Sequence, residues 1–365
     1  MSLAQKVLSS PVLAALASPH SMDRYLEVFN PMWAATEVRA RVVDVTRETD
    51  GVATLTCEPT STWRGHRAGQ YVQVGVELPG SAKRLTRCFS ISSAASAPGE
   101  RITLTIRAHE EGQVSKYLVH EAKPGLMLHL SQAEGAFTLT ESPATPTNNH
   151  LLMISGGSGI TPVMSQVRTL LRDGYDGRAG RKVTFLHYAR SEQDQIFAAE
   201  LAAIAEQDND VTVHLRYGEQ VFSEFELRRL VPDFREVDTW ACGPAPMMEL
   251  VAAAYGVRPT DTAGSRLRTE FFKPPVLTGG STEGEIAFTR SGVVAANSGA
   301  SLLEQAEALG LKPEFGCRMG ICFSCTATKT SGTVRNVLTG ETSSLPDEDI
   351  RICVSAPEGD CQIDL

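Results

Sequence analysis

The sequence lacks any apolar run near the length of a membrane-spanning helix, which takes about 18 residues. Its start is also a poor secretory signal, because the short apolar patch at 12–17 follows Pro11 and only Lys6 is basic. No internal repeat is present. We therefore expect neither a transmembrane segment nor secretion. At 365 residues the chain has room for two or three domains, each with its own core.

Positive charge is in deficit. The chain has 34 Lys and Arg against 43 Asp and Glu, a net charge of −9, so nonspecific binding to nucleic acid is not expected. From residue 282 to the end, 6 basic residues stand against 12 acidic ones, so −6 of the −9 lies there. This distribution indicates either an acidic docking face for a basic partner or an acidic solvated surface with no partner, and it favours neither.

Cysteine is sparse, and its pattern excludes two common uses. Eight cysteines spread over the whole chain do not suit a disulfide-stapled secreted fold, and the paired C-x2-C knuckles of a zinc site are missing. Instead, Cys317, Cys322 and Cys325 form a C-x4-C-x2-C motif with a distant fourth cysteine, the arrangement of a plant-type [2Fe–2S] cluster. Gly316 and Gly320 permit a folded-back loop that points N–H groups at the sulfurs.

The fourth cluster ligand has two candidates, Cys353 and Cys361. Cys353 is preferred because it follows an apolar-rich run, 349–354, that we interpret as a strand. Cys57, Cys88 and Cys361 are then expected to be small buried or incidental residues. The cluster, together with the poor secretory signal, predicts a cytoplasmic protein.

The strand and helix patterns predict a multidomain protein. Residues 1–37 form an arm with a short amphipathic helix, expected to pack against its own domain. Residues 38–143 carry short strands separated by turns, typical of an antiparallel β-barrel. Residues 148–258 alternate strands with helices, as in an α/β domain with a parallel sheet. A linker at 259–281 leads to an α+β domain at 282–365 that contains the cluster motif.

Two short motifs in the barrel have the residue types of a cofactor site. Arg87-Cys-Phe-Ser90 ends a strand; an arginine can neutralise a phosphate, an aromatic ring can stack on a flat ring, and a serine can bond its edge. Gly112-Gln-Val-Ser115 precedes a helix that opens at Lys116, where free N–H groups and a serine make an anion site. Taken singly, 112–115 is more often an ordinary N-capped turn.

Two further motifs lie at the carboxyl edge of the predicted parallel strands. The segment 156–162, Gly-Gly-Ser-Gly-Ile-Thr-Pro, joins a strand to a helix, where glycines let a pyrophosphate approach the backbone. It is not the G-x-G-x-x-G fingerprint, because Pro162 replaces the third glycine. Cys242-Gly-Pro ends another strand at the edge where open sheets bind ligands, although a buried structural thiol is the alternative for Cys242.

In this order, the motifs resemble those of the ferredoxin–NADP reductase superfamily. The chain is most similar to flavin reductases with a plant-type ferredoxin domain fused at the C-terminus, over about residues 38–365. The resemblance implies a flavin-binding barrel, a parallel-sheet domain for NAD(P)H and an α+β plant-type ferredoxin domain. The implied activity is that of an NAD(P)H-dependent oxidoreductase, in which a flavin accepts the two-electron hydride and passes on single electrons.

The resemblance also implies roles for the residues at matching positions. Ser90, Thr161 and Cys242 are expected to act at the point of hydride transfer. Phe89 stands where the family often has tyrosine, so stacking is kept while a phenol hydrogen bond is lost. Glu270-Phe-Phe272 resembles the family's Glu-x-Phe. The expected cofactor-binding residues are Arg87, Cys88, Phe89, Ser90, Ile106, Gly112, Val114, Ser115, Gly156, Gly157, Gly159, Thr161, Pro162, Arg190, Ser191, Cys242, Gly243, Pro244 and Phe272, and the cluster ligands are Cys317, Cys322, Cys325 and Cys353.

The choice of flavin and nucleotide is less defined. FAD is favoured over FMN because Gly112–Ser115 suits a pyrophosphate. After the strand at 183–188, Arg190 and Ser191 suit a 2′-phosphate, and no acidic residue ends the strand to bind a ribose hydroxyl. Glu192 and Asp194 are nearby, so NADPH is favoured and NADH stays open.

The electron acceptor is the remaining question. With its long N-terminal arm, the chain most resembles reductase partners of membrane fatty-acid (acyl-CoA) desaturases. This resemblance implies direct electron transfer from the cluster to a di-iron desaturase, with peripheral contact at the membrane. A Rieske-type or di-iron aromatic oxygenase is the alternative acceptor. An alternative of another class is a non-catalytic redox-sensing subunit.

Overall fold

The structure is a computed structural model that describes residues 21–80, 84–110, 112–139, 142, 145, 148–173, 182–258, 262–272, 281–320 and 322–365. The first twenty residues of the predicted arm lie outside these ranges, as do residues 259–261 and 273–280 of the predicted linker. The chain forms two compact units, residues 1–243 with 266–268 and residues 244–265 with 269–365.

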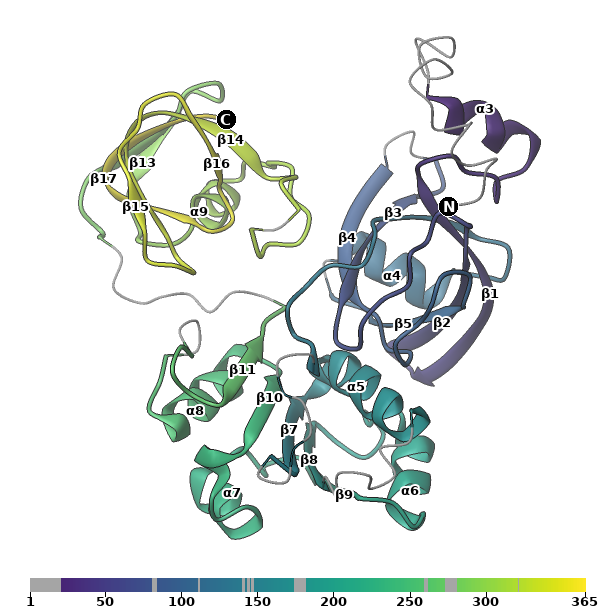
Figure 1. Ribbon diagram of the computed structural model, residues 1–365. Helices are drawn as coiled ribbons and strands as arrows, with labels where there is room; N and C mark the ends of the chain where they lie inside the picture. Colours follow the sequence, from purple (N-terminus) through teal and green to yellow (C-terminus); the bar gives the residue numbers. More distant parts are fainter. Residues whose placement is uncertain are drawn as a thin grey trace. The chain divides into compact units, whose positions relative to one another are not determined.

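A six-stranded antiparallel barrel follows the N-terminal helix α3 (Met22–Phe29) (Figure 1). Its strands pair in the order β4-β3-β6-β1-β2-β5, and a bridge between Ile91 and Leu104 joins the two ends of that order. Val, Ile and Leu side chains of these strands form the buried core, against which helix α4 (Gln113–His120) packs. The strands are β1 (Val38–Thr49), β2 (Val52–Pro59), β3 (Tyr71–Glu77), β4 (Arg84–Ser90), β5 (Ile102–Arg107) and β6 (Met127–Leu130).

A five-stranded sheet follows in the order β11-β10-β7-β8-β9, with β10, β7, β8 and β9 parallel. The run Leu151–Ile154 is fully buried, as expected of a strand covered on both faces. Helices α5 and α6 lie on one side of the sheet and α7 on the other (Figure 1). The elements are β7 (His150–Gly156), α5 (Ile160–Arg172), β8 (Lys182–Ala189), α6 (Ala198–Glu206), β9 (Val211–Tyr217), α7 (Glu224–Leu230), β10 (Asp238–Cys242) and β11 (Leu267–Glu270).

Part of the predicted linker is an ordered element. Strand β11 falls within the predicted linker 259–281, so the sheet continues into that range. Within 142–149, the hydroxyl of Ser142 bonds to the carboxylate of Asp238, and the amide of Asn148 donates to the same carboxylate at 2.9 Å. These bonds attach Ser142 and Asn148 to β10.

Barrel and sheet are joined by side chains of α5. Ser165 Oγ donates to the carbonyl of Ser93 at 2.6 Å, and the Gln166 amide donates to the carbonyl of Phe137 at 2.8 Å. Both side chains are fully buried. Helix α5, which begins at the glycine turn, is bonded to barrel loops. The edge of the sheet that carries this turn therefore has a fixed position relative to the barrel.

The C-terminal domain is a small α+β fold in the second unit, which also holds helix α8 (Ala245–Tyr255). Its strands run in the order β13-β12-β17-β14-β15, and β16 pairs with β14. A buried apolar cluster that includes Phe288, Leu302 and Ile363 forms its core. The elements are β12 (Glu285–Phe288), β13 (Val293–Ala296), α9 (Leu302–Ala308), β14 (Thr326–Asn336), β15 (Thr342–Ser343), β16 (Glu348–Arg351) and β17 (Ser355–Asp364). The predicted three-domain fold class is confirmed.

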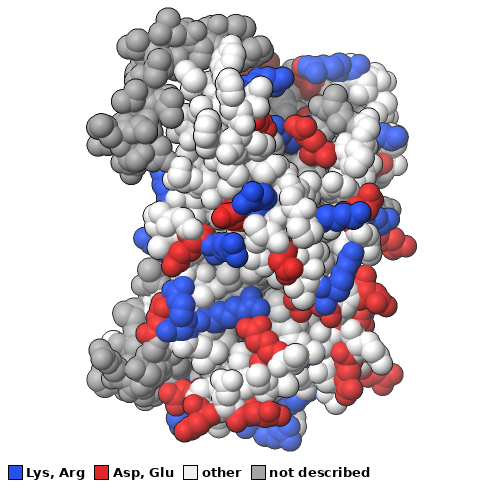
Figure 2. Space-filling model, turned by 90° about the vertical axis from the view of Figure 1, so that its right-hand side faces the viewer, with Lys and Arg blue, Asp and Glu red and all other residues white. Residues whose placement is uncertain are grey.

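In the part of the chain that the structure describes, no helix is long and apolar enough to cross a membrane. On the face drawn in Figure 2, acidic and basic side chains are interspersed, and no patch of one sign covers it. Close ion pairs such as Arg41–Glu58 at 2.6 Å and Arg168–Glu200 at 2.5 Å balance charge locally.

Candidate functional site

The cluster motif forms a loop between α9 and β14 whose backbone turns toward its own sulfurs. The N–H of Cys317 donates to Sγ of Cys322 at 3.1 Å, and the N–H of Met319 donates to Sγ of Cys317 at 3.2 Å. A side chain at Gly316 would place its Cβ 2.5 Å from Sγ of Cys322. The loop therefore needs glycine there, and its N–H groups are placed to stabilise thiolate charge.

The four predicted ligands gather as two pairs. The hydrogen bond with Cys317 raises the pKa of the Cys322 thiol to about 12, and the hydrogen bond with Cys353 lowers the pKa of Cys325 to about 7. Among the described residues, no three His, Cys, Asp or Glu side chains are placed to hold a single metal ion. The charge of Cys322 acts on Cys325 and that of Cys317 on Cys353, so the two pairs are close enough to fit a [2Fe–2S] cluster, in which each iron takes two protein ligands.

The position of Cys353 differs from the sequence interpretation. The run 349–354 was expected to be a strand, but β16 ends at Arg351 and β17 begins at Ser355, so Cys353 lies in the turn between them. The same thiol is buried, and its contacts are with Cys325 and the backbone of Gly320. Side chains along a strand alternate between its two faces, whereas a turn residue is free of this constraint and can direct its thiol into the cluster loop. Cys361 lies within β17, where burial raises its pKa to about 11.

The cluster loop also contains two non-glycine residues in the left-handed region, Arg318 and Phe323, each with φ of 57°. Arg318 forms an ion pair with Glu307 and lies 3.9 Å from the ring centroid of Phe315. Phe323 is 64% exposed, and the Arg351 guanidinium lies 5.0 Å from its ring centroid. The sequence analysis did not single out Phe323 as a residue of the cluster site, because an apolar residue between two cluster ligands does not by itself predict a role.

In the barrel, the Arg-x-Phe-Ser residues lie at the end of β4, as expected. Ser90 is buried, whereas Arg87, Cys88 and Phe89 are partly exposed. Phe89 packs against the barrel core, and Arg87 Nη1 donates to the carbonyl of Thr86 at 2.8 Å. Ile106 is 1% exposed and belongs to the core. A strand end with a partly exposed cation and aromatic ring fits a flavin phosphate and ring system.

The Gly112 turn opens helix α4 earlier than expected. The helix begins at Gln113 rather than Lys116, so Val114 and Ser115 belong to its first turn. Ser115 Oγ accepts from the N–H of His109 at 3.1 Å and donates to the carbonyl of Gly112 at 3.2 Å. Among the described residues, no side chain caps this helix. Its first-turn N–H groups can therefore bind a phosphate, which fits the FAD pyrophosphate.

In the parallel sheet, the glycine turn packs directly on the Cys-Gly-Pro segment. A Cβ added to Gly159 would lie 2.2 Å from the carbonyl oxygen of Cys242, so only glycine fits. Thr161 is 2% exposed in the first turn of α5, and its hydroxyl donates to the carbonyl of Ser158 at 3.0 Å. Cys242 is fully buried at the end of β10. The structure thus brings Gly156, Gly157, Gly159, Thr161, Pro162, Cys242 and Gly243 to one sheet edge.

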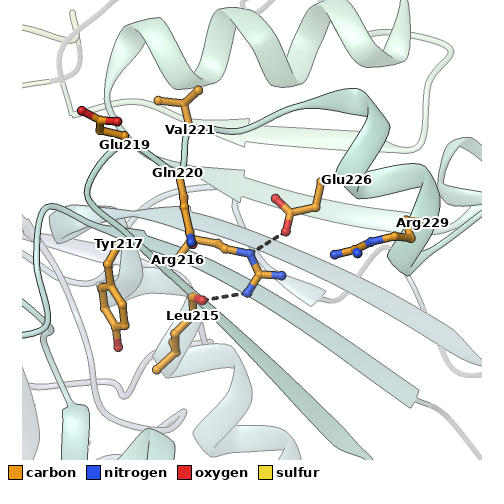
Figure 3. Close-up of a pocket in the computed structure, with 8 residues that line it drawn as sticks. All are labelled: Leu215, Arg216, Tyr217, Glu219, Gln220, Val221, Glu226 and Arg229. Atoms are coloured by element: carbon orange, nitrogen blue, oxygen red, sulfur yellow. Dashed lines mark hydrogen bonds and ion pairs between the residues drawn. The ribbon is translucent and has the colours of Figure 1, made fainter.

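The predicted phosphate residues after β8 lie beside a pocket that sequence reasoning missed. Ser191 Oγ donates to Asp194 at 2.9 Å, and the carbonyl of Arg190 accepts from the N–H of Gly218. The pocket, about 640 Å³, lies at the end of β9 (Figure 3). Arg216 bonds to Glu226 at 2.5 Å, whereas Arg229 reaches toward Arg216 from α7 (Figure 3). The pocket is lined by Leu215, Arg216, Tyr217, Glu219, Gln220, Val221, Glu226 and Arg229.

The Glu270-Phe-Phe272 segment begins at the last residue of β11. Oε2 of Glu270 is buried and has no hydrogen-bond partner among the described residues, although the residue as a whole is partly exposed. Burial raises the pKa of Glu270 to about 8. The segment marks the chain's exit from the sheet.

Three family models match the chain in the predicted order. They are an oxidoreductase FAD-binding domain at residues 42–139, an oxidoreductase NAD-binding domain at 153–253 and a 2Fe-2S iron-sulfur cluster binding domain at 288–358. These matches confirm the predicted FAD, nicotinamide nucleotide and [2Fe–2S] cluster. The roles of single residues stay predictions.

Similar proteins of comparable length are reductases. An NADPH oxidoreductase of Mycobacterium tuberculosis is 36% identical over 97% of this chain and 91% of its own. NADH oxidoreductase HCR of Escherichia coli is 32% identical over 88% and 96%. The structure of phthalate dioxygenase reductase, 19% identical, covers 90% of this chain and 98% of its own with a TM-score of 0.58, and shows the same fold.

Motifs, fold and matches agree. An FAD barrel, a nicotinamide-nucleotide sheet and a cluster domain make an NAD(P)H-dependent electron-transfer oxidoreductase, which confirms the predicted enzyme class. The chain therefore belongs to the ferredoxin–NADP reductase superfamily, as a flavin reductase with a plant-type ferredoxin domain at its C-terminus.

Proposed function

We propose that this reductase uses NADPH to supply electrons, from its own cluster, to a membrane di-iron fatty-acid (acyl-CoA) desaturase. The observation that carries the choice of acceptor is an apolar face on the N-terminal arm. A flavin held by the barrel would supply the chemistry that converts a two-electron hydride into single electrons for the cluster. The chain's part is to hold the nicotinamide beside the flavin through Ser90, Thr161 and Cys242.

Asp23 holds the arm folded on itself, and Arg39 of β1 attaches the arm to the barrel. The carboxylate of Asp23, 1% exposed, accepts from the N–H of Ala35 at 2.6 Å and from the N–H of Thr36 at 3.1 Å. The fully buried side chain of Arg39 in β1 pairs with Glu27 of α3 at 3.2 Å. The carboxylate of Asp23 and the Arg39–Glu27 pair fix the orientation of α3, so one face of the helix packs inward as the sequence predicts.

The opposite face of the arm is apolar and exposed. Val28 and Phe29 of α3 are 81% and 80% exposed, and Tyr25 and Trp33 are 45% and 56% exposed. Clustered exposed aromatic and aliphatic side chains mark an interaction surface. Tyr and Trp favour the membrane–water interface, and an amphipathic helix binds there through its apolar side. This face supports an acceptor at a membrane surface.

The choice of NADPH rests on Arg190, which follows β8, and on Arg229 of α7. Arg190 directly follows β8, which ends without an acidic residue although Glu192 and Asp194 lie in the loop that follows, and Arg229 forms no ion pair with any described residue. A 2′-phosphate in the pocket of Figure 3 would meet Arg229 and the guanidinium of Arg216. Of the two oxidoreductase relatives, the NADPH oxidoreductase of Mycobacterium tuberculosis, with the higher identity, supports the same donor, whereas NADH oxidoreductase HCR supports NADH.

The test of the acceptor uses vesicles that contain a di-iron acyl-CoA desaturase. Val28→Ser with Phe29→Ser should lower NADPH-driven desaturation several-fold and leave cytochrome c reduction unchanged. Phe225→Ser is the matched control, because Phe225 on α7 is also 80% exposed. Desaturation that is equal in the arm variant and the control would mean that the arm has no role at the membrane.

A second acceptor class has support from relatives. The reductase subunit of glycine betaine monooxygenase from Pseudomonas aeruginosa is 29% identical over 91% of this chain, and a 3-ketosteroid-9-alpha-monooxygenase reductase component is also similar. If a Rieske-type or di-iron aromatic oxygenase is the acceptor, the purified reductase will drive it without vesicles, and the arm variant will be as active as the wild type.

The donor test is an anaerobic titration with NADPH and, separately, NADH, following flavin and cluster absorbance together. NADPH should bleach both at a lower concentration than NADH, and Arg229→Gln should reduce that preference. Preference for NADH would overturn the choice of donor without affecting the electron path.

A further inference from the structure

Arg107, the last residue of β5, reaches from the barrel to the glycine turn of the parallel sheet. A Cβ added to Gly157 would lie 3.3 Å from Nη1 of Arg107, so the guanidinium lies against the turn between β7 and α5. Nη2 lies 3.8 Å from Oδ1 of Asp194, which is in the loop after β8. A single cation from the barrel thus stands between the nucleotide turn and a carboxylate of the sheet domain.

The ion pair of Arg107 with Asp194 is weak. At 3.8 Å it is longer than a hydrogen bond, and the two side chains are 24% and 39% exposed. Asp194 has a second partner, since Oδ2 accepts from Ser191 Oγ at 2.9 Å. A pyrophosphate carries two charges and can accept paired hydrogen bonds from one guanidinium. It can therefore displace Asp194 from Arg107, while Ser191 keeps the carboxylate in place.

We propose that Arg107 binds the pyrophosphate of the nicotinamide nucleotide, and that Asp194 competes for the same guanidinium when the nucleotide site is empty. Asp194 thereby lowers nucleotide affinity and eases product release. Arg107 belongs to the flavin barrel, so the bound nucleotide is held by both domains of the first unit. The proposal rests on the nucleotide lying along the glycine turn, and on neither the acceptor nor the 2′-phosphate site.

The experiment measures binding of ADP-ribose to the full-length enzyme loaded with FAD and cluster. Arg107→Gln should weaken binding about tenfold or more, and Arg107→Lys should recover part of it because the charge is kept. Asp194→Asn should tighten binding about two- to fivefold. KM for NADPH should move in the same directions with kcat little changed, since the pyrophosphate is remote from the hydride.

The double variant separates competition from a structural role. Asp194→Asn should have no effect on ADP-ribose binding once Arg107 is Gln, because its target is gone. Equal tightening in both backgrounds, or no change of affinity in either single variant, would overturn the proposal. Arg41→Gln, which removes a barrel arginine paired with Glu58 at 2.6 Å, is the charge-matched control and should bind as the wild type does. FAD content and melting temperature of each variant report folding.

ADP-ribose also separates this proposal from the proposed function. It lacks a 2′-phosphate and involves no acceptor, so the choice of NADPH or of the desaturase can fail while the Arg107 result stands. Arg107→Gln should weaken NADPH and NADH equally, whereas Arg229→Gln should change their ratio.

Discussion

The glycine turn of the nucleotide sheet and the cluster loop of the ferredoxin domain bend the backbone by different means. In the turn, the close approach to Cys242 is made by Gly159, and the one positive φ, 54°, belongs to Gly157. In the loop, Gly320 with φ of 72° is accompanied by Arg318 and Phe323, both at 57°. The glycine turn avoids backbone strain by using glycine, whereas the cluster loop keeps a strained positive φ at two residues with larger side chains.

This difference follows from what each segment binds. A nucleotide is held by backbone N–H groups, so a preformed, unstrained turn suffices. A cluster is held by four thiolates, and metal–ligand bonds contribute directly to folding free energy. The loop can therefore keep residues that cost about 1–2 kcal/mol each in the left-handed region, since ligation opposes their relaxation.

The largest expected effect comes from removing a ligand. Cys353→Ser should abolish cluster absorbance and cytochrome c reduction while sparing ferricyanide reduction by the flavin, because the flavin barrel and nucleotide sheet do not depend on the cluster. Cys361→Ser is the control, since this buried thiol of the same domain lies outside the ligand pairs. A Cys353→Ser enzyme that retains the cluster, or a Cys361→Ser enzyme that loses it, would reverse the assignment of the fourth ligand.

In the glycine turn, a substitution that creates a steric clash should reduce stability more than one that only strains a positive φ. Gly159→Ala places a methyl group 2.2 Å from a backbone carbonyl and should destabilise the first unit by about 3 kcal/mol, with loss of NADPH binding. Gly157→Ala meets only the movable end of Arg107 and should cost about 1–2 kcal/mol from its positive φ. Chemical denaturation followed by flavin fluorescence measures both, and equal losses would contradict the comparison.

Acid should affect the two regions unequally, because all eight histidines precede residue 215 and the ferredoxin domain has none. Burial lowers the pKa of His187 to about 3 and that of His66 to about 4. Below the ordinary value of 6.5, the unfolded chain binds protons that the folded chain does not, so stability is lost as pH falls. Each of these two histidines lowers the free energy of unfolding by about 1.4 kcal/mol for every pH unit below 6.5.

The measurement compares melting by flavin release with melting by cluster absorbance between pH 6.5 and 5. The flavin signal should fall steeply and the cluster signal little. In a His187→Gln enzyme the flavin slope should be reduced. An unchanged slope would mean that His187 is not neutral in the fold.

Sequence reasoning predicted the features that depend on local pattern. Strand and helix alternation, the order of the motifs and the spacing of Cys317, Cys322 and Cys325 all reflect contacts within a few residues, and the structure and the family matches agree with them. The helix before Lys116 and the strand that reaches Cys353 were misplaced, because element ends depend on tertiary contacts that a pattern does not contain.

The residues that sequence reasoning missed are those whose role depends on distant neighbours. Arg107 ends an ordinary barrel strand, and only folding brings it to Gly157 and Asp194. Arg229 lies on a helix surface, where an arginine usually faces solvent. The sequence predicts an arm with a short amphipathic helix, but burial of Asp23 decides which side of that helix faces outward. Such sites can be found only from which residues lie close together in three dimensions, and not from their spacing in the sequence.

The smallest effect is also the sharpest test of strain in the cluster loop. Phe323→Asn should relieve part of the 1–2 kcal/mol of left-handed strain, since Asn tolerates positive φ, while losing about 0.5–1 kcal/mol from Arg351 over the ring. The net gain should be about 0.5 kcal/mol, read as a higher temperature of cluster loss. Phe323→Leu keeps the strain and loses the ring, so it should melt lower. If Asn also melts lower, the ring contact outweighs the strain, and the loop is held by its side chains as much as by its ligands.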